Sequence, residues 1–397
     1  MKKRLFSLLM TLVLLLSVLP VPANAAEDTI TVYNWGQYIS DGSDGSLDVI
    51  AAFEEETGIK VNYVTFDSNE SMYTKLKTGG TSYDVIIPSD YMIAKLIEED
   101  MLLPLNYDNI PNYQYIDEQL HNPTYDPENL YSVPYTRGTV GIIYNTKYVD
   151  EVTSWSSLFD ANYAGKILMF DNCRDAFAIG ESMLGYSLNT NDLNELQDVA
   201  NLLATQKDLV QSYVMDQIFD KMIREEAWIA PYYAGDYIYM VEENPDLAFC
   251  FPEEGFNSFV DAMCIPASCE NKEGAEAFIN FMCRPDICAA NLEYIGYTAP
   301  MEAAKEYMDP EVAEDPVTYP GEEVLARSTS FVNLSLEATQ HMNNLWLSVK
   351  TSGDDAGRYL LITGVILLFV LLWIGLQKLR RRRRKARRCA KWKQQNT

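Results

Sequence analysis

Short apolar runs rich in β-branched and aromatic residues alternate with stretches of helical spacing along residues 29–99. The runs typical of strands are Thr29–Tyr33, Ile59–Phe66 and Tyr83–Pro88, and the last of these reads as a buried parallel strand. The stretches with helical spacing are Ser46–Thr57, Ser71–Leu76 and Met92–Glu99. Strand and helix alternating with short links predict an α/β fold with a doubly wound sheet.

The same pattern returns further along the chain. Strands are predicted at Tyr131–Tyr135, Thr139–Asn145, Lys166–Phe170, Leu247–Phe251 and Asp261–Ile265. Helices are predicted at Trp155–Leu158, Arg174–Leu184, Asn191–Thr205, Tyr213–Glu225, Lys272–Met282 and Leu334–Lys350. We expect two lobes joined by crossing strands, one formed by residues 26–136 and 262–305 and the other by residues 137–261 and 306–350. Since ligands bind outside the carboxyl ends of strands in such sheets, the lobes should face each other across a cleft.

Residues 1–25 have the pattern of a secretory signal peptide. A basic start, Lys2–Arg4, precedes the apolar run Leu5–Leu19, and Ala23-Asn24-Ala25 offers a small-x-small cleavage site. No cysteine follows that site, which argues against a lipoprotein anchor. An uncleaved N-terminal anchor is the alternative interpretation. Either way, we expect the body of the protein to lie outside the cytoplasm.

The other end of the chain predicts a membrane anchor. Tyr359–Leu376 is an eighteen-residue stretch without charge, which as a helix would span roughly 27 Å. We expect a polar linker at 351–357, a transmembrane helix at 358–378 and a basic tail at 379–397. By the positive-inside rule this tail should stay cytoplasmic.

The charge distribution excludes one class of partner for the body. The chain has 57 acidic residues against 31 Lys and Arg, a net charge of −26. Three of the bases lie in residues 1–25 and twelve in residues 358–397, which leaves residues 26–357 near −41. Such an acidic body repels phosphate backbones, so we expect no binding of nucleic acid. Its six cysteines permit disulfides, but several lie in apolar runs, where buried free thiols are commoner.

Motifs for catalysis are absent. The two histidines, His121 and His341, are isolated, and there is no Gly-x-Ser-x-Gly elbow, no Walker A sequence and no Gly-x-Gly-x-x-Gly loop. A zinc knuckle also lacks support, because no Cys-x-x-Cys occurs. We therefore expect neither an enzyme nor a bound cofactor or metal.

Aromatic and acidic residues gather where predicted strands end or begin. They are Trp35, Gln37, Tyr38, Ser89, Asp90, Tyr91, Asn172, Asp175, Tyr233, Asp236, Phe259, Asp261 and Tyr297. Each alone is more often a core side chain, a turn or a helix cap. Together they fall on one predicted face. Aromatic rings attract an organic cation through their quadrupoles, and carboxylates pair with its ammonium groups.

Several of these segments resemble one family closely. The segments are Tyr33–Trp35, Glu54–Val61, Ser68–Lys77, Val85–Tyr91, Asn271–Ala275 and Tyr294–Tyr297. Over residues 31–350 the chain resembles the spermidine/putrescine-binding proteins, the ligand-capturing components of polyamine ABC importers. The resemblance implies a two-lobed, type II-like periplasmic-binding-protein fold, a monomeric ligand-binding body, a polyamine ligand and ABC permease subunits as partners.

The resemblance also implies roles for individual residues. Trp35, Tyr38, Tyr91 and Tyr297 match aromatics of the ligand cage, Ser89 matches a polar wall residue, and Asp175 and Asp261 match carboxylates that pair with ammonium groups. Phe259 and Tyr233 stand where the best-known members have tryptophan. Gln37 and Asn172 replace a glutamate and an aspartate, while Asp90 and Asp236 offer other acids. Two carboxylate clusters would suit putrescine, and a third would favour spermidine.

Two other functions remain open at this point. The adjacent Tyr232 and Tyr233 resemble the paired phenolates of ferric-iron receptors. Alternatively, a membrane-anchored polyamine sensor or adhesin would keep the binding site without transport.

Overall fold

The computed structural model describes residues 28–351. The chain divides into two compact units, Met1–Met342 and Asn343–Thr397. All described strands lie in the first unit, and of the second the structure describes residues 343–351, the end of helix α13 (Leu336–Thr351). The predicted signal peptide, transmembrane helix and basic tail lie outside the described residues. Within residues 28–351, no helix combines the length and apolar character that a membrane span requires.

Ten strands of the described residues form one continuous hydrogen-bonded sheet in the first unit. They are β1 (Thr29–Trp35), β2 (Lys60–Phe66), β3 (Val85–Ile86), β4 (Ser132–Asn145), β5 (Ile167–Phe170), β6 (Val210–Val214), β7 (Ile229–Tyr233), β8 (Leu247–Cys250), β9 (Phe256–Cys264) and β10 (Ser328–Thr329). The main order is β2-β1-β3-β9-β4-β7-β5-β6, with β8 on β4 and β10 on β9. Parallel pairs lie at both ends, β1 with β2 and β3, and β5 with β6 and β7.

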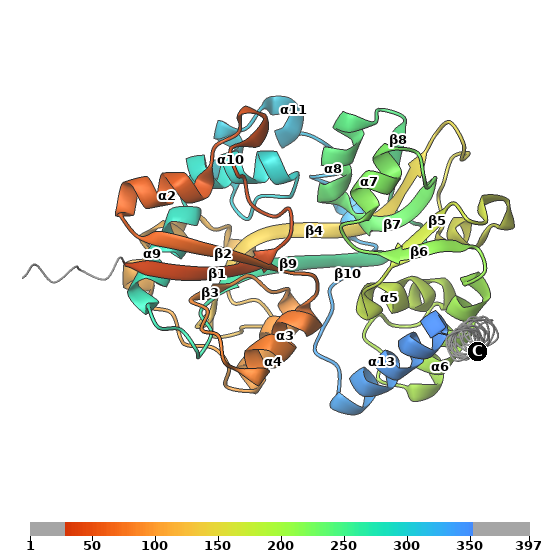
Figure 1. Ribbon diagram of the computed structural model, residues 1–397, viewed down its shortest axis with the longest axis horizontal. Helices are drawn as coiled ribbons and strands as arrows, with labels where there is room; N and C mark the ends of the chain where they lie inside the picture. The colour runs from red at the N-terminus through yellow and green to blue at the C-terminus, as the bar shows by residue number, and fades with distance from the viewer. Residues whose placement is uncertain (1–27, 352–397) are drawn as a thin grey trace, which may run out of the picture. The chain divides into compact units, whose positions relative to one another are not determined.

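Two long antiparallel strands connect the lobes. β4 and β9 pair from Ser132 opposite Cys264 to Thr139 opposite Ser258, and they run side by side through the middle of Figure 1. Beyond this pairing, β4 continues into the second lobe, where it pairs with β7 and β8. The sequence analysis was wrong to divide β4 into two strands. Pro134 and Gly138 interrupt the apolar pattern, but pairing with β9 carries the strand through, with a register shift between Pro134 and Thr136.

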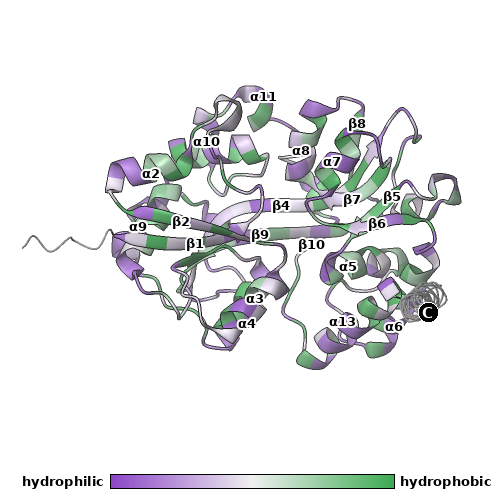
Figure 2. Cartoon of the chain, viewed as in Figure 1, coloured by the Kyte–Doolittle hydropathy of each residue, from purple (hydrophilic) through white to green (hydrophobic). Residues whose placement is uncertain are grey.

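Helices cover the sheet, and their ends follow local sequence signals. Their bounds are α2 (Val49–Thr57), α3 (Asn69–Thr78), α4 (Asp90–Glu98), α5 (Cys173–Leu184), α6 (Leu193–Gln206), α7 (Ile218–Ile223), α8 (Ala234–Glu243), α9 (Lys272–Met282), α10 (Pro285–Ile295), α11 (Pro310–Ala313) and α12 (Glu322–Leu325). Asp48 caps α2 by accepting from the backbone N–H of Ala51. Ser68 and Ser71 form a capping box on α3. Figure 2 shows hydrophobic and hydrophilic positions sharing the same helices, as amphipathic packing requires.

One predicted helix needs correction, and several elements were not predicted. Tyr213 lies in strand β6 rather than in a helix starting there, because Val210–Val214 pairs with β5 and only Ile218–Ile223 is helical. Helices α8 and α10 were not predicted. The start of α8 was hidden by Gly235, and α10 begins at Pro285, which suits the first turn because it lacks an N–H.

No disulfide joins the six cysteines of the described residues. Cys264, Cys283 and Cys288 are buried, and burial raises the pKa of each thiol. The prediction of buried thiols without disulfides in the apolar runs is therefore confirmed for Cys264 and Cys283.

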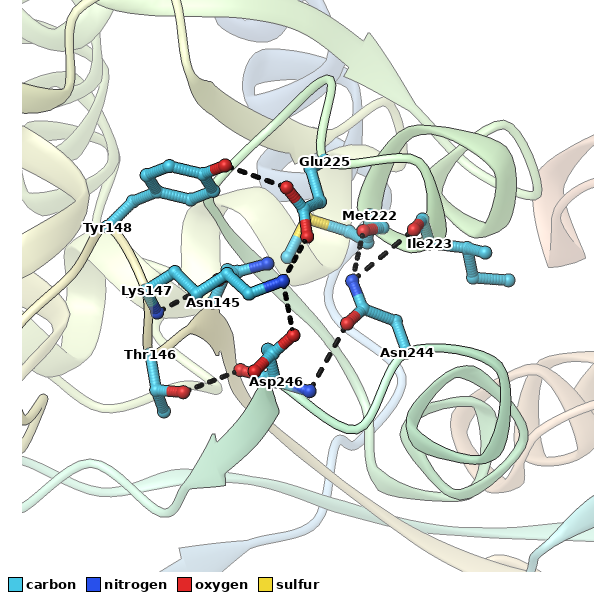
Figure 3. A network of polar contacts seen from close by, with 9 residues as sticks. All are labelled: Asn145, Thr146, Lys147, Tyr148, Met222, Ile223, Glu225, Asn244 and Asp246. Carbon is cyan, nitrogen blue, oxygen red and sulfur yellow. Dashed lines mark hydrogen bonds and ion pairs between the residues drawn. The ribbon is translucent and has the colours of Figure 1, made fainter.

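A polar network fixes the carboxyl end of β4. The ammonium group of Lys147 lies 2.8 Å from Glu225 and 2.5 Å from Asp246, and the Tyr148 hydroxyl donates to Glu225 (Figure 3). Asn244 donates to the carbonyl of Met222 and accepts from the backbone of Asp246. These contacts tie β4, α7 and the start of β8 together. None of the residues in Figure 3 lines the cavity described next.

Candidate functional site

One cavity in the first unit collects the candidate residues. All of them except Gln37 line it, namely Trp35, Tyr38, Ser89, Asp90, Tyr91, Asn172, Asp175, Tyr233, Asp236, Phe259, Asp261 and Tyr297. They come from the ends of β1, β3, β5 and β7, from β9, and from the loop after α10. The carboxyl ends of the parallel strands thus meet at one site, as expected for this topology.

Asp261 is held by hydroxyl groups and keeps one oxygen for another donor. The Tyr38 hydroxyl donates to Asp261 Oδ2 at 2.8 Å and lies 2.5 Å from Thr136 Oγ1. Asp261 is only 3% exposed, and the nearby Ser89 side chain partly offsets the effect of burial on its pKa. No hydrogen bond to its Oδ1 is found among the described residues. A buried acceptor without a donor is costly, so this oxygen is suited to receive an N–H from a ligand.

Asp175 forms a second acceptor on the lobe that carries β5. Its Oδ2 accepts from Asn172 Nδ2 at 2.7 Å and from the Tyr233 hydroxyl at 2.9 Å. Asn172 also caps helix α5, since its Oδ1 accepts from the backbone N–H of Arg174. Asn172 is therefore both a helix cap and a support for Asp175, which places this carboxylate at the cavity wall.

Asp90 and Asp236 add two further acids to the lining. Asp90 accepts from the backbone N–H of Tyr91 at 2.7 Å and of Val260 at 3.4 Å. Asp236 lies in the first turn of α8, where the Tyr297 side chain partly offsets the rise in the pKa of its carboxyl. The cavity thus has carboxylates from both lobes.

Burial makes all four carboxyls hold their protons more tightly than in water. Desolvation raises the pKa of Asp90 and of Asp236 to about 8, of Asp175 to about 7 and of Asp261 to about 6. The negative charge of Asp261 raises the pKa of Asp90 further, and the negative charge of Asp216 raises the pKa of Asp236. An organic cation would relieve this repulsion, so the electrostatics of the cavity favour a ligand with more than one positive charge.

Aromatic rings form the remaining walls. Tyr38 and Tyr297 meet edge to face with ring centroids 4.9 Å apart, and Tyr233 and Phe259 meet likewise at 5.6 Å. Trp35 is fixed by its indole N–H, which donates to the carbonyl of Ile87 at 2.9 Å. Aromatic faces attract a cation, and because hydrogen bonds and packing already hold these rings, binding would cost little side-chain entropy.

Glycine at position 235 makes room for one of these rings. A Cβ there would lie 2.2 Å from the Tyr297 ring, far inside van der Waals contact. We expect Gly235→Ala to displace Tyr297 and destabilise the chain by about 1–3 kcal/mol, with a loss of ligand affinity. Gly321→Ala is the matched control, because nothing lies within 4 Å of its added Cβ. Thermal melting and ligand titration of both variants check this, and equal behaviour of the two would contradict it.

The structure also brings in residues that sequence reasoning missed. They are Gly36, Phe66, Asp67, Asn69, Met215, Asp216, Tyr232, Asn257 and Phe331. Tyr232 had been considered only as an iron ligand. Asp216 follows β6 but lies within Tyr213–Glu225, the stretch that had been predicted as a helix, so its strand-end position gave no signal. Gln37 has a left-handed backbone, with φ of 52°, in the turn after β1, and it is not among the lining residues.

The iron interpretation gains nothing from the geometry. The Tyr233 hydroxyl donates a hydrogen bond to Asp175. Burial raises the pKa of both Tyr232 and Tyr233, which opposes the formation of phenolates. Within residues 28–351, no three His, Cys, Asp or Glu side chains are grouped so as to hold a metal ion.

Comparison with known proteins identifies the family. The bacterial extracellular solute-binding protein family matches residues 48–319. The spermidine/putrescine-binding periplasmic protein of Escherichia coli K12 is 34% identical over 301 residues, which cover 75% of this chain and 85% of that protein.

Two solved structures agree in fold. A spermidine/putrescine ABC transporter protein from Listeria monocytogenes is 39% identical, with a TM-score of 0.78, and covers 82% of this chain and 100% of its own. A spermidine/putrescine ABC transporter substrate-binding protein from Streptococcus pneumoniae is 38% identical, with a TM-score of 0.69, and covers 81% of this chain and 98% of its own. The two-lobed α/β fold is thus that of substrate-binding proteins, whose role in transport is not enzymatic. The chain belongs to the bacterial extracellular solute-binding proteins, in the spermidine/putrescine-binding family that its sequence indicated.

Proposed function

We propose that this protein captures putrescine or spermidine outside the cytoplasm and delivers it to the permease of an ABC importer. The observation that carries the proposal is the pair Asp175 and Asp261, both buried and both enclosed by aromatic side chains in one cavity. Their carboxylates pair with the ligand's ammonium groups, while Trp35, Tyr38, Tyr233, Phe259 and Tyr297 pack on its methylene chain and attract its charge.

The two lobes close over the ligand by a hinge motion. We assign residues 26–136 and 262–305 to one lobe and residues 137–261 and 306–350 to the other. The crossing strands β4 and β9 support this assignment, because they carry the chain between the two sets of parallel strands. Bending within these crossings would bring the acids of the two lobes onto one ligand, and the permease would then recognise the closed form.

The sequence at the ends of the chain supports a membrane-tethered receptor. In this proposal, residues 1–25 export the body, the apolar stretch at 358–378 spans the membrane and the basic tail at 379–397 stays inside. Tethering raises the concentration of the body near its permease without any new contact.

A ligand screen on the full chain in mild detergent tests the binding function. Putrescine, cadaverine, spermidine and spermine are compared by thermal shift and calorimetry, with 1,4-butanediol as the uncharged control. A polyamine that binds the folded state should raise the melting temperature with its concentration, and the diol should leave it unchanged. Equal shifts with the diol and the amines, or no shift with any amine, would contradict the proposal.

A further inference from the structure

Asn257 shares a face of strand β9 with two residues of the candidate site. Positions 257, 259 and 261 are two apart, so the side chains of Asn257, Phe259 and Asp261 point to the same side of the strand. All three line the cavity. Asn257 is 4% exposed, which makes its amide one of the buried polar groups of the site.

The two ends of the Asn257 amide have different surroundings. Its side chain lies close enough to Asp175 to lower the pKa of that carboxyl, which is the effect of an N–H donor, so the amide presents its NH₂ group there. Its carbonyl oxygen, Oδ1, is buried and has no hydrogen-bond partner within residues 28–351. Asn172 and Tyr233 donate to Asp175, and no hydrogen bond from either of them reaches this oxygen. Asn257 Oδ1 is thus an acceptor in the cavity wall beside the carboxylate.

A primary ammonium group needs this kind of acceptor. It carries three N–H donors, and a single carboxylate oxygen can accept only part of them. A neutral carbonyl beside the carboxylate accepts a further N–H without adding another negative charge to a cavity that six acidic residues already line. A secondary ammonium has one N–H fewer and would leave one acceptor unpaired.

We propose, on the basis of the polyamine-binding function above, that Asn257 is a ligand-binding residue that accepts an N–H from the ammonium group paired with Asp175. Through Asn257 the site selects primary amine ends by their number of N–H donors and not by charge alone. Asp261, whose Oδ1 also lacks a partner among the described residues, receives the other end of the ligand.

The test pairs a change in the protein with a change in the ligand. Wild-type full chain and Asn257→Leu are titrated calorimetrically with putrescine and with N,N′-dimethylputrescine, which keeps both charges but loses one N–H at each end. We expect the wild type to prefer putrescine about tenfold. We expect Asn257→Leu to bind putrescine about tenfold more weakly and to discriminate between the two ligands less than threefold. If Asn257→Leu fails to fold, as judged by its melting curve, Asn257→Ala provides the same comparison.

Other outcomes would overturn the inference in distinguishable ways. If the variant loses the same factor with both ligands, Asn257 only positions Asp175. If neither affinity changes, Asn257 makes no contact with the ligand. If the wild type binds neither diamine, the proposed function itself fails, and this inference fails with it.

Discussion

Replacing Asp261 by asparagine should weaken putrescine binding by about 2–5 kcal/mol, because one ammonium group would be buried without its counter-charge. The substitution keeps the shape of the side chain and its hydrogen bond with Tyr38, so the loss would come from charge. Asp261 is almost fully buried, and its partnerless Oδ1 marks the position where a ligand donor fits. Calorimetry of the variant and the wild type at the same pH measures the difference.

Asp208→Asn is the matched control for Asp261→Asn. It removes the same charge from an exposed position of the body that does not line the cavity. If the acidic body as a whole held the ligand, both variants would lose affinity alike. If affinity is unchanged in Asp261→Asn, this residue does not belong to the binding site.

Putrescine affinity should rise by about 10- to 100-fold from pH 5.5 to pH 8. The ligand stays doubly charged over most of this range, since alkylammonium groups titrate near pH 10. Asp90, Asp175, Asp236 and Asp261 titrate within or close to it, with pKa values of about 8, 7, 8 and 6. Only their ionised forms pair with the ligand, so each carboxyl that must lose its proton adds up to about tenfold per pH unit.

Calorimetry in buffers of different ionisation enthalpy measures the protons released on binding. We expect release near pH 7 and little above pH 9, and proton uptake on binding would contradict this expectation.

The stability of the ligand-free chain should fall as pH rises, whereas its affinity for putrescine should rise. A carboxyl with a raised pKa binds its proton more tightly in the folded state, so its contribution is lost as pH rises from about 4 to about 8. Melting curves across this range, with and without putrescine, should diverge as pH rises.

The strand ends were the most predictable part of the structure. Short strands followed by Trp35, Tyr91 or Asp175 have clear local signals, and parallel strands must present these ends on one side. The position of Asn257 was not predictable in the same way. Its segment was not predicted as a strand, because β9 begins at Phe256 through pairing with β4 and β10 rather than through its own apolar pattern. Pairing with strands far away in the sequence sets where such a strand begins. The local sequence gives no sign of which strand it will pair with.

The electrostatics of the cavity could not be derived from sequence either. The net charge of the body is spread over many solvated helix positions, whereas the raised pKa values of Asp90 and Asp236 depend on burial and on a neighbouring acid in each case. Asp216 became part of the site only because β6 ends beside the cavity. What the residues indicated correctly was the chemistry, namely carboxylates and aromatic rings that together suit an organic cation.

The central claim is that this cavity binds a polyamine through Asp175 and Asp261. The most direct test is calorimetric titration of the full chain with putrescine and with spermidine. It compares the wild type with the double variant that carries both Asp175→Asn and Asp261→Asn. We predict a saturable one-to-one interaction with at least one of the two amines, which the double variant abolishes while its melting curve still shows a folded protein. Polyamine binding of undiminished affinity in the double variant, or no binding by the wild type, would contradict the account.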